Sequence, residues 1–211
     1  HYNSRKYKIV WITVAGRSNA LSGVMAANSR HPVIACPPFK DKMDMQVNIN
    51  STLSKIGKNA REASDVLSNC SDDLKNDVLI ETANTIEKSK GSILAANSSD
   101  VSNAKNKNLS VAMIDRLSLD EERLSSIIDS LQIISSLPDP VGTILNTYSR
   151  PNGLDIKKIT TPIGVIGVIF ESRPNVLIDA GALCLKAGNA SILRGGTESV
   201  QTTRSLYNCF R

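Results

Sequence analysis

The feature that most constrains the fold is an apolar run, Ile163–Phe170, which a helical stretch and a second apolar run, Ala190–Arg194, follow along the chain. The first run is apolar at successive positions, so both of its faces would be buried, as in a central parallel strand. Pro174 suits the first turn of the helix, and Gly188 suits its end. This order of elements predicts a β-α-β unit of an open α/β sheet.

A helical layer and a hairpin are expected before this unit. Apolar residues recur at helical spacing from Leu53 to Leu94, and Ser118-Leu-Asp-Glu121 resembles a capping box that opens a further helix. The polar stretch Ser98–Asn108 is predicted to be a loop. Thr143–Ser149 and Leu154–Thr161 flank the turn sequence RPNG, which predicts a β-hairpin.

The first 53 residues have a different pattern. Tyr7–Gly16 and the segment HPVIACPP are predicted strands, with a short helix from Ser18 or Asn19 to about Asn28 between them. Lys40–Thr52 is polar and is predicted to be irregular. The expected division is a partial flavodoxin-like β-α-β segment over residues 1–53, followed by an incomplete Rossmann-like domain over residues 54–211.

Charge and composition exclude several classes of protein. The net charge is +5, and residues 1–53 carry all of it, because the rest of the chain holds 18 basic and 18 acidic residues. No basic tract with interleaved aromatic residues is present, which argues against a nucleic-acid partner. No apolar run is long enough to span a bilayer, so we expect no membrane partner and a cytoplasmic location. The four cysteines are widely spaced and only two histidines occur, so no metal site is expected.

Two loops are candidate sites. Glu171–Pro174 and Arg194–Thr197 each follow a predicted strand, and the ligand crevice of an open α/β sheet lies beyond the carboxyl ends of its strands. Each loop leads into a helix N-terminus, where unpaired N–H groups favour anions, and each carries an arginine that can hold a phosphate or carboxylate. The alternative is that Arg173 and Arg194 are solvated loop residues.

Other reactive side chains are better explained as structural. Cys184 lies among leucines and away from any base, which favours an inert packed thiol over a catalytic thiolate. Lys186 could contact a cofactor phosphate, but a solvated helix residue is the better interpretation. His31 is interpreted as a surface residue at the start of a strand.

Residues from about 54 to 211 resemble the N-terminal part of the gamma-glutamyl phosphate reductase (glutamate-5-semialdehyde dehydrogenase) family, within the aldehyde dehydrogenase superfamily. The segments that carry this resemblance are ILAANSSDV, IDRLSLDEERL, LPDPVG, RPNGLDI and PIGVIGVIFESRPNVLIDAGALCLKAGNASILRGGTES. The resemblance implies reduction of gamma-glutamyl phosphate to glutamate 5-semialdehyde with NADPH, in proline biosynthesis. It also implies self-association into a homo-oligomer.

The same resemblance implies a set of site residues. The cofactor-binding set is Glu171, Ser172, Arg173, Pro174, Asn175, Arg194, Gly195 and Gly196. Asn175 is also the candidate for the oxyanion-stabilising asparagine of the superfamily. The cysteine nucleophile of the family lies in a later segment and matches none of the four cysteines here, so the chain is expected to bind a dinucleotide without catalysing the reduction.

Residues from about 6 to 53 resemble a second family, the phosphoribosylaminoimidazole carboxylase/mutase of purine synthesis. The segments VAGRSNALSGVMAANS, HPVIACPPFKD and NINSTL carry this resemblance. It implies a substrate loop formed by Ala15, Gly16, Arg17, Ser18 and Asn19. The alternatives to the reductase are therefore a purine-pathway carboxylase/mutase and a non-catalytic chimeric fragment.

Overall fold

The structure, a computed structural model, describes residues 11–14, 33–36 and 44–210, with side chains from residue 53 onward. The elements, in chain order, are β1 (Trp11–Val14), β2 (Val33–Cys36), α2 (Asp44–Leu67), α3 (Asp72–Lys88), α4 (Lys90–Asn106), α5 (Val111–Leu117), α6 (Glu121–Ser136), β3 (Ile144–Ser149), β4 (Asp155–Ile159), β5 (Val165–Ile169), α7 (Asn175–Lys186), β6 (Ala190–Arg194), the 3-10 turn η2 (Thr197–Ser199) and α8 (Val200–Phe210). This mixture of helices and strands confirms the predicted α/β class.

The predicted β-α-β unit is present. Strands β5 and β6 pair in parallel, with a register that runs from Val165 beside Ala190 to Ile169 beside Arg194. Helix α7 connects the two strands. It ends at Lys186, and Gly188, with a positive φ of +69°, follows the cap residue Ala187 and closes the helix as the sequence predicts. The two strands therefore finish at the same edge of the sheet.

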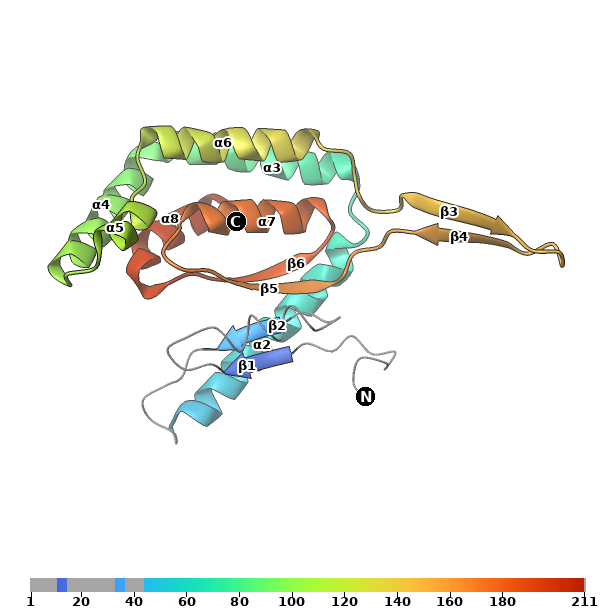
Figure 1. Cartoon of the computed structure of the whole chain (residues 1–211), viewed down its shortest axis with the longest axis horizontal. Coiled ribbons are helices and arrows are strands. Elements are labelled where there is room, and N and C mark those ends of the chain that lie inside the picture. Colours follow the sequence, from blue (N-terminus) through green and yellow to red (C-terminus); the bar gives the residue numbers. More distant parts are fainter. Residues whose placement is uncertain (1–10, 15–32, 37–43, 211) are drawn as a thin grey trace.

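The helices lie in layers over this sheet (Figure 1). Helices α3 and α6 pack side by side above α7, α7 covers one face of the β5–β6 sheet, and α2 lies against the other face. The buried core joins α3, α4, α6, α7 and α8 through the side chains of Leu79, Ile86, Ile93, Leu124, Leu131, Ile178 and Leu206. Burial of these apolar side chains is the main term that stabilises the fold.

The hairpin is also confirmed. Strands β3 and β4 are antiparallel, with Tyr148 opposite Ile156, and Arg150 N–H donates to the carbonyl of Leu154 at 2.9 Å across the turn. Gly153 supplies the positive φ, +82°, that this turn requires. In Figure 1 the hairpin extends away from the layered helices.

Two predictions about helices are wrong. Ser98–Asn108 is not a loop, because α4 continues through it to Asn106. Its polar residues Asn97 and Asp100 are buried against other elements, so the apolar periodicity of an amphipathic helix is missing. The capping box is also not formed as predicted: Asp120 caps α6 by accepting from Arg123 N–H, whereas Ser118 ends α5.

The N-terminal region differs from its prediction in where α2 begins. Strands β1 and β2 pair in parallel, as expected for a β-α-β unit, but the helix predicted near Ser18 lies outside the described residues. Helix α2 begins at Asp44, within the stretch predicted to be irregular. The domain boundary predicted at residues 53 and 54 thus falls inside a helix, and the division into two domains stays a prediction.

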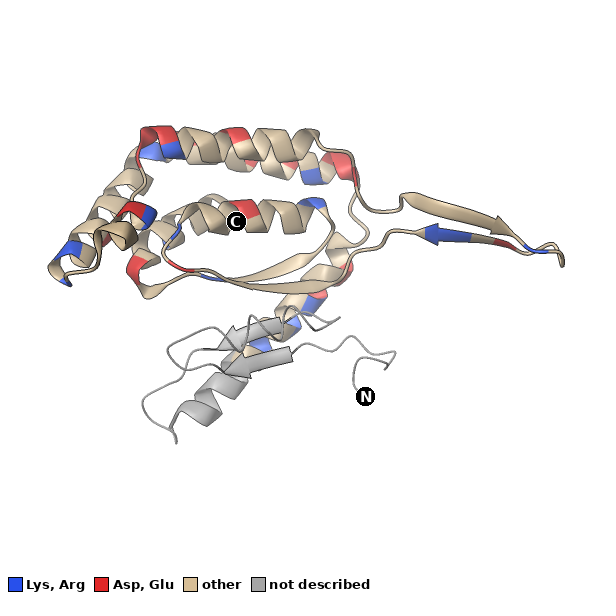
Figure 2. Cartoon of the chain, viewed as in Figure 1, with Lys and Arg blue, Asp and Glu red and all other residues tan. Residues whose placement is uncertain are grey.

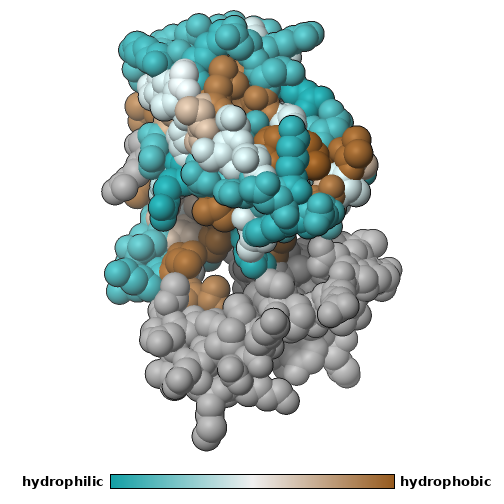
Figure 3. Space-filling model, turned by 90° about the vertical axis from the view of Figure 1, so that its left-hand side faces the viewer, coloured by the Kyte–Doolittle hydropathy of each residue, from teal (hydrophilic) through white to brown (hydrophobic). Residues whose placement is uncertain are grey.

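Charged residues and apolar surface areas are dispersed on the faces that Figures 2 and 3 show. Figure 2 shows basic and acidic residues interspersed along the α3–α6 layer. Figure 3 shows separate apolar areas within a hydrophilic surface at the end of the molecule that α4 and α5 form. Among the described residues, no helix is long and apolar enough to cross a membrane.

Candidate functional site

The two candidate loops meet at the carboxyl edge of the sheet. Ile169 and Arg194 are register partners at the ends of β5 and β6. Directly after β5, Phe170 N–H donates to the carbonyl of Arg194 at 3.0 Å. The hydrogen-bonded ladder thus continues one residue past β5 and fixes where both loops begin.

Gly195 and Gly196 allow this close approach. A Cβ on Gly195 would lie 3.1 Å from the ring of Phe170, and a Cβ on Gly196 would lie 3.2 Å from the backbone nitrogen of Ser172. Both distances are shorter than ordinary van der Waals contact. The glycines therefore bring the two loops together, which sequence spacing could only suggest.

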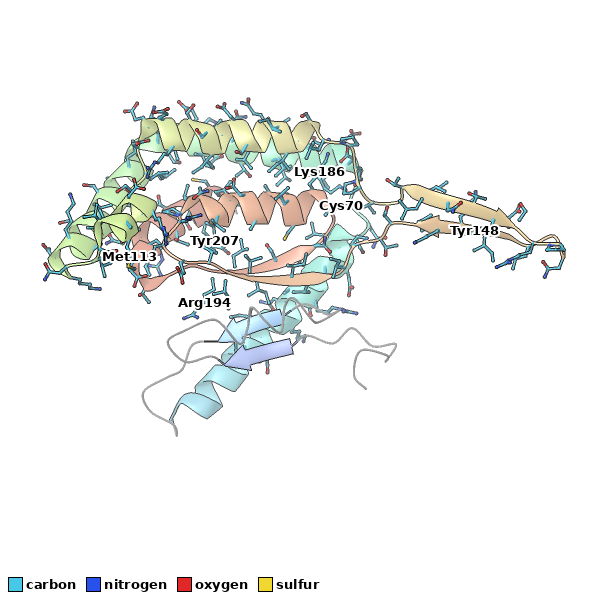
Figure 4. All side chains as sticks on the ribbon, in the orientation of Figure 1. Cys70, Met113, Tyr148, Lys186, Arg194 and Tyr207 are labelled. Atoms are coloured by element: carbon cyan, nitrogen blue, oxygen red, sulfur yellow. The ribbon has the colours of Figure 1, made fainter. Side chains whose placement is uncertain are left out.

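The predicted site residues differ in exposure. Ser172 and Pro174 are buried, Gly195 and Gly196 are half-buried, and Glu171, Arg173, Asn175 and Arg194 are exposed. Neither Arg173 nor Arg194 has a carboxylate within ion-pair distance among the residues whose side chains are described. Figure 4 shows Arg194 on the side of the sheet away from α7. Both guanidinium groups are therefore available to an anionic ligand.

A cavity of about 530 Å³ adjoins this edge. Its walls combine the Arg194–Gly196 loop with the apolar side chains of Leu193 and Phe210 and with Tyr207 of α8. Tyr207 is 51% exposed, and Figure 4 shows it on the α8 side of the sheet. A cavity with apolar walls, an aromatic ring and an arginine loop can accommodate a ring system that carries anionic groups.

The start of α8 is not the open anion site that the sequence predicts. Its N–H groups at Gln201 and Thr202 donate to the carboxylate of Asp100, at 3.4 and 2.8 Å. Sequence reasoning missed Asp100, which lies in the stretch interpreted as a loop. The Asn-x-x-Asp spacing of Asn97 and Asp100 on a helix was the available signal, since residues three apart share a helix face.

Asn175 forms a contact within its own helix. Its Nδ2 donates to Asp179 Oδ2 at 3.0 Å. Burial raises the pKa of Asp179, and the hydrogen bond from Asn175 opposes this shift. The oxyanion role of Asn175 stays a prediction, and in this structure its amide is directed to a carboxylate.

One of the cysteines with described side chains, Cys184, is buried. Burial raises the pKa of the Cys184 thiol, which confirms the packed-thiol interpretation. The thiols of Cys70 and Cys209 donate to carbonyls one turn earlier in their own helices. In the part of the chain with described side chains, no group of His, Cys, Asp or Glu residues could hold a metal ion.

Lys186 is not the solvated helix residue that was predicted. Its ammonium is buried and donates to Asp72 Oδ1 at 2.7 Å and to Asn76 Oδ1 at 2.6 Å. The hydrogen bond from Lys186 lowers the pKa of Asp72. Lys75 lies beside it and donates to Asp139 Oδ2 at 2.7 Å and to the Lys186 carbonyl at 3.2 Å. This buried ion cluster joins α3, α7 and the loop before β3. Figure 4 shows Lys186 at the end of α7 that faces α3.

The chain shares the fold of about one third of an aldehyde dehydrogenase chain. A Bacillus subtilis protein assigned as an aldehyde dehydrogenase matches 76% of the chain with a TM-score of 0.57 and 13% identity, which shows the shared fold alone.

Closer similarity is to gamma-glutamyl phosphate reductase. The crystal structure of the Thermotoga maritima enzyme matches 75% of this chain and 38% of its own, with a TM-score of 0.73 and 35% identity. The Saccharomyces cerevisiae enzyme gives a TM-score of 0.72 at 34% identity, covering 74% of this chain and 40% of its own.

Curated sequences show the same similarity. The gamma-glutamyl phosphate reductase of Ruthia magnifica is 46% identical over 164 residues, which are 78% of this chain and 39% of that protein. The reductase of Bartonella henselae is 50% identical over 155 residues, 74% of this chain and 38% of that protein. The chain thus spans about two fifths of the length of these relatives, and its similarity is to their N-terminal part.

The N-terminal segment matches a second family. A protein-family model described as AIR carboxylase matches residues 1–57, which confirms the resemblance stated for that segment. The predicted substrate loop, Ala15 to Asn19, lies outside the described residues. Two unrelated similarities therefore adjoin within one chain.

Proposed function

We propose that this chain provides the dinucleotide-binding part of an NADPH-dependent gamma-glutamyl phosphate reductase of proline biosynthesis. The observation that supports the proposal best is the approach of Gly196 to Ser172, which brings the two loops of the predicted site together. Glu171 to Asn175 would contact the cofactor from one loop, and Arg194 to Gly196 from the other. The nicotinamide, when bound, would supply the hydride.

The proposal gives no catalytic role to the cysteines with described side chains. Reduction of an acyl phosphate through a thioester needs a thiolate nucleophile. Cys184 is buried and its pKa is raised, so it is held as the neutral thiol. We therefore propose that this chain binds NADPH and that no cysteine with a described side chain carries out the reduction.

Removal of Arg194 tests the cofactor proposal. Arg194→Ala should weaken NADPH binding roughly tenfold or more, because a charge-assisted hydrogen bond contributes about 1.5–3 kcal/mol. Arg116→Ala is the matched control, since Arg116 is an exposed arginine on α5. Titration of each protein with NADPH and with NADH, followed by cofactor fluorescence, measures the effect. Equal affinities for the two Arg→Ala variants would reject the site, and equal affinities for NADPH and NADH would reject the preference for NADPH.

We also propose that the chain self-associates through its hairpin. Every residue of β3 and β4 is exposed, among them Ile144, Leu145, Tyr148, Ile156 and Ile159. An isolated two-stranded hairpin is at best marginally stable in water, and its open edges can pair with another strand. Two copies joined by a two-fold axis would cover the same surface on each other.

A double charge substitution tests this association. Tyr148→Asp combined with Ile156→Asp should convert an associated protein to a monomer in sedimentation velocity at micromolar concentration, because two carboxylates would be buried in the interface. Tyr148 and Ile156 are cross-strand partners, whereas Thr147 points to the opposite face of its strand. Thr147→Asp is therefore the control. A monomeric unmodified protein would contradict the proposal.

The N-terminal similarity supports a second proposed function for that segment. The AIR carboxylase match covers residues 1–57. A purine-pathway carboxylase/mutase role would depend on the substrate loop from Ala15 to Asn19. It is the alternative to the reductase role, and a non-catalytic chimeric product is the third.

A further inference from the structure

Asp100 is a buried carboxylate that has no cationic partner among residues 53–210, whose side chains the structure describes. It is 4% exposed, and among the described side chains no Lys, Arg or His lies within ion-pair distance of it. Its Oδ2 accepts from Thr202 N–H and from Thr202 Oγ1, both at 2.8 Å, and its Oδ1 accepts from Gln201 N–H at 3.4 Å. A buried charge is costly unless such hydrogen bonds compensate it.

These contacts make Asp100 the cap of a helix that starts 100 residues later in the chain. Gln201 and Thr202 are the second and third residues of α8, whose N–H groups have no intrahelical acceptor. A cap ordinarily comes from the residue just before the helix. Here that residue, Ser199, turns its hydroxyl back to the carbonyl of Gly196 at 3.3 Å. The positive end of the α8 dipole therefore faces a carboxylate of the protein itself.

Asn97, one turn before Asp100 in α4, also contacts the first turn of α8. Its Nδ2 donates to Thr202 Oγ1 at 3.2 Å and to the Leu117 carbonyl at 2.9 Å. Its Oδ1 accepts from Leu119 N–H at 2.8 Å. The side chains of Asn97, Thr202 and Asp100 thus all form hydrogen bonds. A buried network in which every polar side chain is hydrogen-bonded favours a single arrangement of the elements that it joins.

The network is connected to the candidate site by short steps. Ser199 is fully buried, and its N–H and hydroxyl both point to the carbonyl of Gly196. Thr203, next to Thr202, donates its hydroxyl to Ser199 Oγ at 3.3 Å. Gly196 in turn lies against the backbone of Ser172 in the other loop. The position of the first turn of α8 therefore sets the position of the Arg194–Gly196 loop.

We propose that Asp100 is a positioning residue for the dinucleotide site. From α4 it fixes the first turn of α8 and, through Ser199, the loop that carries Arg194. Because it occupies the N–H groups of Gln201 and Thr202, an anionic part of the ligand is held by Arg194 and not by the start of α8. This inference rests on the proposed function for the ligand, but the positioning itself is measured without one.

Asp100→Asn tests the positioning. The substitution keeps the size of the side chain and removes its charge, so amide hydrogen exchange at Gln201 and Thr202 should accelerate roughly tenfold or more. The affinity for NADPH should fall in the same variant. Asp129→Asn is the control, because Asp129 is an exposed carboxylate on α6 and neither quantity should change. Far-UV circular dichroism confirms that each variant is folded.

A second pair of variants guards against loss of folding. Thr202→Val removes the hydroxyl between Asn97 and Asp100, and Thr202→Ser retains it. Exchange in the Arg194–Gln201 segment and NADPH affinity should change for valine and be restored by serine. A role in packing alone would predict a larger effect for serine, which loses the methyl group.

Each outcome decides the proposal. Unchanged exchange at Gln201 and Thr202 in Asp100→Asn would overturn it. Tighter NADPH binding in that variant would also overturn it, because Asp100 would then be a competitor for a ligand anion. If the unmodified chain does not bind NADPH, the cofactor assignment fails, and the exchange measurements alone decide whether Asp100 positions the loop.

Discussion

Asp139→Ala is expected to lower the free energy of unfolding by about 3–5 kcal/mol, the typical effect of removing one partner of a buried ion pair. The side chain of Lys75 is only 1% exposed, and among the described side chains Asp139 is its single carboxylate partner, at 2.7 Å. Without that carboxylate the ammonium would remain buried with the Lys186 carbonyl as its described acceptor. An uncompensated buried charge is the costly state.

Removal of Lys75, the other partner of the ion pair, should lower the free energy of unfolding by less. Lys75→Met leaves Asp139 unpaired, but the side chain of Asp139 is 25% exposed and water can solvate it. We expect a loss of about 1–3 kcal/mol, the range for an unsatisfied polar group. Glu121→Ala, which breaks the surface pair of Lys90 and Glu121, should have no measurable effect. Urea unfolding followed by circular dichroism gives the three values. If Asp139→Ala is as mild as Glu121→Ala, the buried pair does not stabilise the protein.

Gly188→Ala should lower the free energy of unfolding by about 2–5 kcal/mol, from two additive causes. The φ of +69° at Gly188 lies in the left-handed region, which costs an alanine about 1–2 kcal/mol. The added Cβ would also lie 2.9 Å from Pro162 Cγ, and overpacking of this kind costs about 1–3 kcal/mol. The proline ring cannot rotate away.

Gly153 provides the matched control for this substitution. Its φ is +82°, but no atom lies within 4 Å of the position of an added Cβ. Gly153→Ala should therefore show the backbone cost alone, about 1–2 kcal/mol. Thermal and urea unfolding of both variants separate strain from packing. Equal losses at the two glycines would mean that the contact with Pro162 relaxes freely.

Local patterns predicted the elements around the candidate site. Successive apolar residues in Ile163–Phe170, the glycine after α7 and the RPNG turn each carry their information within a few positions. The structure confirms the strand pair, the connecting helix and the hairpin. The loops were therefore placed at one sheet edge correctly, because strands joined by a helix in parallel end on the same side.

Predictions failed where polar residues are buried. Helix α4 lacks an apolar stripe because Asn97 and Asp100 occupy its inner face, so its C-terminal half was interpreted as a loop. Lys186 was interpreted as solvated, since lysine is rarely buried without a partner. Its partner Asp72 lies 114 residues away in the chain. The residues next to Lys186 and Asp72 in the sequence do not indicate that the two side chains form an ion pair.

The sequence by itself determined the β5–α7–β6 unit, the hairpin and the glycines that allow the loops to approach. Spacing and turn chemistry act over one or two turns of chain and can be read directly. Only the tertiary structure decided the roles of Asp100, Lys75 and Lys186, because their hydrogen bonds join residues 64 to 114 positions apart. The charge of such a group is tolerated in the interior only where the fold brings donors and acceptors to it, and that depends on how the helices pack.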